Sequence, residues 1–283
     1  MLKKNNCAAF CTFRTAVLLL CLSFGGNAFA QGYGQASEIG VWLGASNFRG
    51  DVASSISSST PALGVVYRYA INDYLAFRAG VALTFLRGND ANSESPFVRA
   101  RNLSFSSHLV ELSSQLDLHF MKFKIGDEKH YFTPYLTTGI AVFQFNPTTK
   151  YNDERYSLPD IGTEGQQNDL SGRKPYKQLQ LAIPAGGGIK FWMRKQWTFY
   201  AEAAYRNTFT DYLDDVSTTY IDSYLLGDGT TAAALADRSG ETGIEPIGEE
   251  GRQRGDSTNK DGYWLLNVGL TYAIIPNRCP KSK

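Results

Sequence analysis

Acidic residues gather in one stretch of the sequence, RNTFTDYLDDVSTTYID, which runs from Arg206 to Asp222. Asp214 and Asp215 are adjacent, and Asp211 precedes Asp214 by three residues. Neighbouring carboxylates of this kind could act as a catalytic pair or bind calcium. A calcium loop, however, places its ligands at alternating positions around a glycine turn, and this stretch lacks that spacing. We therefore expect Asp214 and Asp215 to be solvated or structural, and we predict no metal site.

A serine and a histidine form a second candidate for chemistry. Ser106 and His108 are two residues apart, so they share one face of a strand. A serine hydrolase also needs an acidic side chain that orients the histidine. Glu111 would fall on the opposite face, and serine is frequent in this part of the chain. The pattern therefore favours a protein without catalytic residues, and a lipid-modifying enzyme remains the alternative.

A glycine-rich stretch, PAGGGIKF, covers Pro184–Phe191. A phosphate-binding P-loop would end in Gly-Lys-Ser or Gly-Lys-Thr, and this stretch does not. Glycines at such a position are more typical of close packing or curvature in a strand. No cofactor is predicted.

The first thirty residues predict export. Lys3, Lys4 and Arg14 accompany a short apolar run that ends in an AFA sequence, as in a secretory signal peptide. We expect residues 1–30 to be cleaved and residues 31–283 to form a single domain. The mature chain would then carry 25 Lys and Arg against 27 Asp and Glu. This near balance does not favour nucleic-acid binding.

Apolar and polar residues alternate in eight separate runs of the mature chain. Alternation with a period of two is typical of strands whose two faces meet different surroundings. Several runs reach about ten residues, which is the length that a tilted strand needs to cross a bilayer. The predicted strands are Glu38–Ser46, Ala62–Ile71, Tyr74–Leu86, Asn102–Lys122, Phe132–Phe145, Gln178–Trp192, Trp197–Arg206 and Gly262–Ile274.

Short and long connections alternate between these strands. The short ones fall at Asn72–Asp73, Phe123–Tyr131 and Met193–Gln196, and the longest is Asn207–Asp261, with a net charge of −8. Alternating connections and an even strand number are typical of outer-membrane barrels. The sequence therefore predicts an eight-stranded antiparallel transmembrane β-barrel with short periplasmic turns, long extracellular loops and both termini in the periplasm. A soluble β-sandwich is the alternative, but it would not explain the alternation.

The alternation also assigns the two faces of the barrel, except in Phe132–Phe145, where its phase is ambiguous. An eight-stranded barrel is just wide enough for its own side chains to fill it. Charges in so narrow a space should pair, so we expect a plugged lumen. The residues expected to face lipid are Leu75, Phe77, Val81, Leu83, Leu116, Leu118, Leu266, Val268 and Leu270. Those expected in the lumen are Glu38, Arg68, Arg78, Glu111, Gln115, Asp117, Gln180, Lys190, Glu202, Arg206 and Asn267.

Several stretches resemble one family in order along the chain. They include EIGVWLGASNFRGDV, PALGVVYRY, FTPYLTTGIAVFQFNP and IPAGGGIKF, and the most specific are GTEGQ and TFTDYLDDVSTTYID. The sequence resembles the PorG-like outer-membrane proteins of the type IX secretion system, also described as DUF6089 barrels. The resemblance implies an outer-membrane barrel that contacts a periplasmic ring lipoprotein and its associated subunit, with no catalytic residues to carry over. A related barrel outside secretion, for example one that binds ligands at the cell surface, is the alternative.

Basic residues mark the side of the barrel on which such a partner would bind. A plugged barrel can contact a periplasmic machine only through the turns and ends that it exposes there. Basic residues beside a membrane also bind lipid headgroups, so outer-membrane lipid is a second expected partner. The predicted partner-binding residues are Lys124, Lys129, Arg194, Lys195, Arg278, Lys281 and Lys283.

Overall fold

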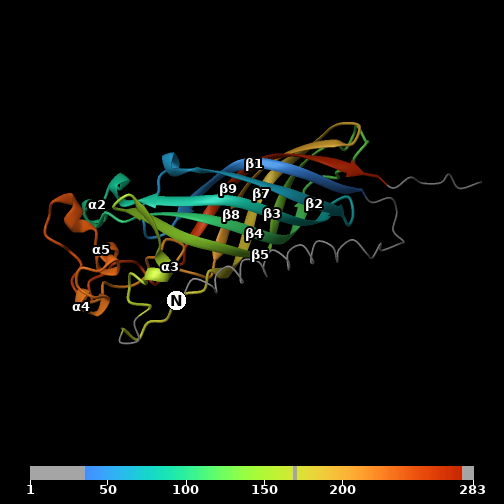
Figure 1. Ribbon diagram of the computed structural model, residues 1–283. Coiled ribbons are helices and arrows are strands. Elements are labelled where there is room, and N and C mark those ends of the chain that lie inside the picture. Colours follow the sequence, from blue (N-terminus) through green and yellow to red (C-terminus); the bar gives the residue numbers. More distant parts are fainter. Residues whose placement is uncertain (1–35, 168–170, 276–283) are drawn as a thin grey trace, which may run out of the picture. The chain divides into compact units, whose positions relative to one another are not determined.

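The computed structural model describes residues 36–167 and 171–275 (Figure 1). The predicted leader and the tail residues Arg278, Lys281 and Lys283 lie outside the described residues. Eight long strands form one antiparallel sheet in the order β4-β3-β2-β1-β9-β8-β7-β5, and a further pairing of β4 with β5 closes the sheet into a barrel. The predicted fold is therefore confirmed.

All eight predicted strands are present, and most extend a few residues further than predicted. The short β6 (Glu154–Ser157) is a ninth strand that pairs with the end of β5 in a hairpin. The barrel strands are β1 (Ser37–Arg49), β2 (Thr60–Ala70), β3 (Leu75–Asn89), β4 (Ser104–His119), β5 (Phe132–Tyr151), β7 (Leu179–Arg194), β8 (Trp197–Thr208) and β9 (Gly262–Ile274).

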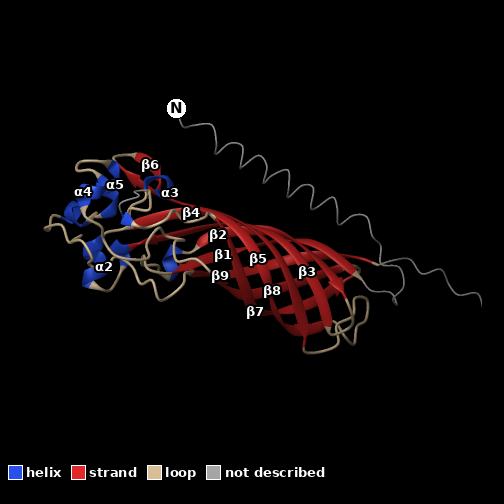
Figure 2. Cartoon of the chain, turned by 90° about the horizontal axis from the view of Figure 1, so that it is seen from below, coloured by secondary structure: helices blue, strands red, loops and turns tan. Residues whose placement is uncertain are grey.

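The two ends of the barrel differ in their connections. Residues 71–74, 120–131 and 195–196 connect strands at one end, which we call the short-turn end. Ser37 pairs with Ile274, so β1 begins and β9 ends there as well. The long connections lie at the opposite end, which we call the loop end, and they carry short helices (Figure 2). These helices are α2 (Pro96–Arg101), α3 (Leu158–Ile161), α4 (Ser223–Leu226) and α5 (Thr231–Ala236), with 3₁₀ turns at Ile56–Ser58, Asp90–Asn92 and Ser239–Thr242.

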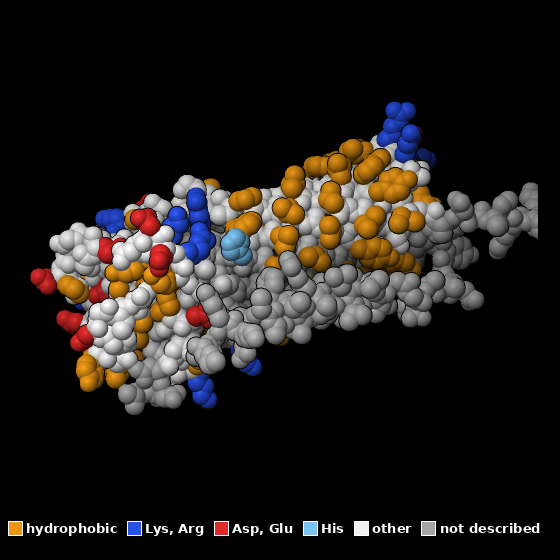
Figure 3. All heavy atoms as spheres, in the orientation of Figure 1, with side chains coloured by type: hydrophobic (Ala, Val, Ile, Leu, Met, Phe, Trp, Pro, Cys, Tyr) orange, Lys and Arg blue, Asp and Glu red, His pale blue; other side chains and the backbone are white. Residues whose placement is uncertain are grey.

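The strands present apolar side chains outward, as predicted. Leu266 is 53% exposed and Val268 is 51% exposed, whereas the intervening Asn267 is 7% exposed. In β5, whose faces the sequence left ambiguous, Ile140 is exposed and Ala141 is buried. Hydrophobic side chains cover the visible outer face of the barrel (Figure 3). No helix in the described parts is long and apolar enough to cross a membrane.

Aromatic residues border this apolar face at both ends. At the short-turn end, the rings of Trp197 and Tyr272 lie 5.2 Å apart. At the loop end, Tyr205 and Trp264 form a similar pair, also 5.2 Å apart. Aromatic side chains favour the two interfaces of a bilayer because they combine an apolar ring with a polar edge. The pairs therefore mark the two margins of a lipid-facing belt.

The outward face of β9 supplies a direct test of this assignment. We expect Val268→Arg to impair barrel assembly, because a charge in the middle of a lipid-facing belt costs about 2–4 kcal/mol. Asn267→Arg should be tolerated better, since Asn267 faces the polar lumen, where Glu202 of the neighbouring strand lies directly opposite it, and not the lipid. The folded fraction of each variant can be measured by heat-modifiable migration in gels. Equal assembly of the two variants would contradict the assigned faces.

Candidate functional site

The lumen of the barrel contains equal numbers of buried cations and carboxylates. The four buried cations contributed by the strands are Arg68, Arg78, Lys190 and Arg206, and the four buried carboxylates are Glu38, Glu111, Asp117 and Glu202. The sequence predicted all eight as inward-facing. Gln180, also predicted inward, lies near the loop end of β7 and is only partly buried.

Arg78 occupies the centre of this network. Its guanidinium pairs with Glu202, and its Nε lies 3.4 Å from Oδ1 of Asp117. Its Nη2 donates hydrogen bonds of 2.7 Å to Gln115 and to Thr137. One side chain on β3 therefore contacts β4, β5 and β8 across the barrel. The two terminal nitrogens of Arg78 therefore exchange water for hydrogen bonds inside the barrel, whereas its Nε has only the longer contact with Asp117.

Two further ion pairs lie towards the ends of the lumen. Near the short-turn end, Lys190 lies 2.5 Å from Glu38, which also accepts a 2.6 Å hydrogen bond from Thr271. Near the loop end, Arg206 lies 3.3 Å from Glu111. These pairs fill the barrel along its length.

Little free space remains between these side chains. A lumen cavity lined by Trp42, Arg78, Glu111 and Asn267, among others, measures about 30 Å³. A cavity of this size holds about two water molecules, because about 10–15 Å³ of such space is enough for one. The described lumen is therefore a packed polar core and has no room there for a hydrated solute to pass.

Asp214 and Asp215 lie above the lumen, in the long connections at the loop end. Both side chains are buried, with 1% and 0% exposure. Of the two expected roles, the solvated one is therefore wrong, and the two aspartates are structural. Asp214 accepts hydrogen bonds from the backbone N–H groups of Val52 and Val216, at 2.8 and 3.0 Å. The two carboxylates are buried because neighbouring loops fold over them, which local sequence does not reveal.

Asp215 accepts its hydrogen bonds from side chains instead. The hydroxyl of Thr163 donates to one oxygen at 2.5 Å, and the hydroxyl of Tyr176 donates to the other at 2.6 Å. Burial raises the pKa of Asp215 to about 6. Its backbone has a φ of 69°, a conformation that aspartate and asparagine tolerate better than most residues. Asp215 therefore connects the loop after β8 to the loop after β5.

A buried ion pair that the sequence analysis missed joins the same two loops. Glu164 is fully buried, and its Oε1 lies 3.0 Å from Nη1 of Arg254. Glu164 also accepts hydrogen bonds from the backbone N–H groups of Ser217 and Thr218. Glu164 belongs to GTEGQ, and Ser217 and Thr218 belong to TFTDYLDDVSTTYID. The two most specific stretches of the sequence are therefore in direct contact.

The remaining long connections join this assembly. Arg101, at the end of α2, lies 2.7 Å from Asp90 and donates to the backbone carbonyl oxygens of Asp51 and Arg254. We call the described residues of the four long connections, 50–59, 90–103, 152–178 and 209–261, the loop cap. Ion pairs and backbone hydrogen bonds hold the loop cap together as a folded layer over the barrel.

Asp51, Asp214 and Asp261 of the loop cap lie close enough for one carboxylate to raise the pKa of another, and none of them forms an ion pair with the described residues. Burial raises the pKa of Asp51 to about 6. Burial and the nearby Asp51 raise the pKa of Asp214 well above its usual value, and burial and Asp214 do the same for Asp261. Among the described residues, no group of three or more His, Cys, Asp or Glu side chains has an arrangement that could hold a metal ion.

Ser106 and His108 both point outward from β4, as predicted. The His108 ring packs edge-on against Phe85, with centroids 4.8 Å apart. No carboxylate among residues 36–167 and 171–275 forms a hydrogen bond with His108. Glu111 points into the lumen, where it binds Arg206 and Tyr263. The structure therefore does not bring a Ser–His–acid arrangement together here.

The basic residues predicted to bind a partner meet at the short-turn end. Lys124 and Lys129 belong to the connection of β4 to β5, and Arg194 and Lys195 belong to the turn between β7 and β8. The two turns are neighbours, because Trp192 N–H donates to the carbonyl of Tyr131. All four basic side chains are exposed, and none forms an ion pair with the described residues. Lys and Arg side chains gather visibly at this end in Figure 3.

These features define the class of the protein. A closed eight-stranded barrel with an apolar outer belt, aromatic margins and a polar, packed lumen is a membrane-spanning β-barrel. The chain belongs to the family described as Domain of unknown function (DUF6089), whose model matches residues 14–226. No curated protein matches the sequence.

Among solved structures, the chain is similar to several small barrels. It has 10% identity and a TM-score of 0.39 to the N-terminal β-barrel domain of Pseudomonas aeruginosa OprF, covering 86% of this chain and 100% of that one. It has 11% identity and a TM-score of 0.42 to Neisserial surface protein A, covering 84% and 97%. The corresponding values for the Yersinia pestis attachment invasion locus protein are 10% and 0.41, covering 85% and 99%. Similarity at this level says nothing about what this chain binds.

The Arg206–Glu111 pair tests whether charge balance holds the lumen together. We expect Arg206→Met to destabilise the barrel by about 3–5 kcal/mol, because it leaves Glu111 buried without its cation. Arg206→Met combined with Glu111→Gln should recover most of that loss. Urea unfolding of the barrel in lipid vesicles measures both free energies. If the double variant is as unstable as the single one, loss of packing and not loss of charge pairing explains the effect.

The two adjacent aspartates should respond differently to the same substitution. Both oxygens of Asp214 accept from backbone N–H groups, which can only donate. Asp214→Asn therefore points its amide N–H at one of these donors, and we expect it to destabilise the loop cap by about 1–3 kcal/mol. Asp215→Asn should cost less, because the hydroxyls of Thr163 and Tyr176 can rotate to accept from the amide. The rate of proteolysis within residues 209–261 reports opening of the loop cap, and both variants should still form the barrel. Faster cleavage in Asp215→Asn than in Asp214→Asn would contradict this account.

Proposed function

We propose that this protein is a non-catalytic outer-membrane barrel that anchors a periplasmic protein-secretion complex to the membrane. In this proposal the short-turn end faces the periplasm and the loop cap faces the outside. The observation that carries it is the packed lumen beneath a folded cap. Such a barrel acts through its exposed surfaces, because nothing passes through its interior.

The short-turn end is the surface best suited to a partner. Lys124, Lys129, Arg194 and Lys195 are exposed cations on two adjacent turns, and none of them forms an ion pair with the described residues. Exposed cations near a membrane attract an acidic surface and accelerate its association. We therefore infer that the partner presents an acidic face to these turns.

The resemblance to PorG-like proteins supports a specific partner. It implies contact with a ring lipoprotein of the type IX secretion system and with its associated subunit. Both of these proteins lie in the periplasm, on the side to which the proposal assigns the basic turns. The exposed cations of the two turns and the resemblance both support this surface as the one that binds the partner.

Charge reversal at the basic turns tests the proposal. In the variant with Lys124→Glu, Lys129→Glu, Arg194→Glu and Lys195→Glu, we expect capture of the ring lipoprotein from mildly solubilised membranes to fall by roughly tenfold or more. The barrel should still assemble, because these side chains are exposed and make no ion pairs with the described residues. Capture by the unchanged protein should also weaken as salt is raised, since salt screens exposed charges.

A matched control carries the same charge change at the other end of the barrel. Arg49→Glu, Lys174→Glu, Lys177→Glu and Lys260→Glu alter four exposed cations at the loop end. This control should retain the partner. Normal capture by the turn variant together with loss in the control would reverse the proposed orientation.

A further inference from the structure

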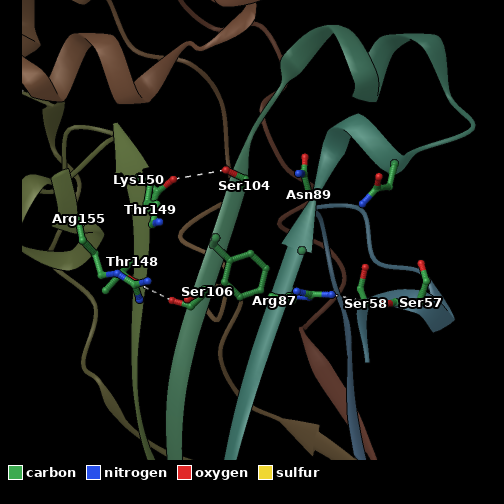
Figure 4. Close-up of a pocket in the computed structure, with 13 residues that line it drawn as sticks. Ser57, Ser58, Arg87, Asn89, Ser104, Ser106, Thr148, Thr149, Lys150 and Arg155 are labelled. Carbon is green, nitrogen blue, oxygen red and sulfur yellow. Dashed lines mark hydrogen bonds between the residues drawn. The ribbon is translucent and has the colours of Figure 1, made fainter. Parts of the chain in front are cut away.

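A pocket of about 470 Å³ opens at the loop end of β3, β4 and β5, where the 3₁₀ turn at Ile56–Ser58 also borders it (Figure 4). Strand pairing places Arg87 opposite Ser106, and Ser106 opposite Thr148. Lys150 and Arg155 face each other across the hairpin of β5 and β6. In Figure 4, Arg87 and Arg155 lie on either side of Ser106. Three separate segments therefore bring three cations to one pocket.

The three cations are available to a ligand. Arg87, Lys150 and Arg155 are exposed, and none forms an ion pair with the described residues. Arg87 donates one long hydrogen bond of 3.4 Å to the carbonyl of Ser57, and the side chains of Lys150 and Arg155 make no hydrogen bond within the described parts. By contrast, the buried arginines of the loop cap are fully engaged with carboxylates and carbonyls.

Carboxylates close to the pocket have other partners. Glu154 accepts a 2.8 Å hydrogen bond from the hydroxyl of Tyr156. Glu241 forms an ion pair of 2.9 Å with Arg238, which also donates to the hydroxyl of Ser104 at the pocket wall. The residues that line the pocket include three cations and no carboxylate, so the lining carries a net positive charge.

Hydrogen-bond donors surround the cations. The hydroxyls of Ser57, Ser58, Ser104 and Ser106 and the amides of Asn89 and Asn92 all belong to residues that line the pocket. An anion with several oxygens can accept from a guanidinium, an ammonium and hydroxyls at once, and charge-assisted bonds of this kind are the strong ones. A phosphate group fits this set of donors better than a carboxylate does, because it offers more acceptor oxygens.

The position of the pocket indicates the source of the phosphate. Arg87, Phe85 and Leu83 share the outward face of β3. Phe85 precedes Arg87 by two residues and the lipid-facing Leu83 precedes it by four, so both lie on the membrane side of Arg87. Two residues of strand span about 7 Å, so the pocket lies just beyond the apolar belt. Figure 3 shows Lys and Arg side chains at this edge of the belt. A lipid whose chains lie on Leu83 and Phe85 would present its headgroup to the three cations.

We propose that the pocket lined by Arg87, Lys150 and Arg155 binds the phosphate group of a lipid in the outer leaflet. The assignment to the outer leaflet rests on the orientation in the proposed function. The binding itself requires no periplasmic partner. The purified barrel alone can therefore test this inference, and its failure is distinguishable from failure at the basic turns.

The test compares two lipids on the unchanged protein. The barrel is titrated in micelles of dodecyl maltoside, a detergent without phosphate, with bisphosphorylated lipid A, or with lipid A from which the phosphates have been removed, and bound lipid is counted by native mass spectrometry. We expect binding of the phosphorylated lipid to be stronger by on the order of 100-fold, about fivefold for each cation. Equal binding of the two lipids would overturn the proposal.

Variants locate the site. Arg87→Gln, Lys150→Gln and Arg155→Gln together should remove the preference for the phosphorylated lipid. The matched control Lys174→Gln, Lys177→Gln and Lys260→Gln removes three exposed cations from the same end and should keep the preference. If the control loses the preference as fully as the pocket variant does, general surface charge explains binding and the pocket is not the site.

A competition arm separates a lipid from free phosphate. Inorganic phosphate, added at the concentration of the lipid phosphate groups, should leave the bound lipid in place, because it lacks the acyl chains that rest on the belt. Full displacement under these conditions would assign the pocket to free phosphate and overturn the assignment to a lipid.

Discussion

The pairing of eight charged side chains inside a closed barrel is the constraint on which the rest of this structure depends. Burying an unpaired charge costs several kcal/mol, so the four cations and four carboxylates must meet one another in the lumen. Each strand must therefore keep a register that brings its polar residue to the right height. The pairs in turn join strands that are not neighbours in the sheet. Arg78 on β3, for example, contacts Glu202 on β8.

The loop cap extends the same principle beyond the membrane. Long loops usually lie on a surface because their backbone groups need hydrogen-bond partners. Here buried carboxylates supply these partners: Asp214 accepts from Val52 and Val216, and Glu164 accepts from Ser217 and Thr218. The loops can pack tightly over the barrel for this reason. A filled lumen beneath a folded cap directs any function to the outer surfaces of the molecule.

Those surfaces carry two separate sets of unpaired cations. One set lies on the two adjacent turns at the short-turn end, and the other lines the pocket beyond the belt at the loop end. Both sets remain exposed although the protein pairs its buried charges. A membrane barrel with these surfaces can contact a protein on one side of the bilayer while lipid headgroups contact it on the other.

The sequence by itself determined the eight strands and the faces of all of them except β5, because alternation with a period of two is a local property that a lipid-facing belt preserves along a strand. It also placed Lys190 and Glu38 in the lumen, since inward positions follow from the same alternation. Only the tertiary structure decided which charges pair, because register brings together residues such as Lys190 and Glu38 that are far apart in the chain. The same holds for Asp214 and Asp215. Their hydrogen-bond partners come from three of the long connections, and no local pattern records how those loops fold together.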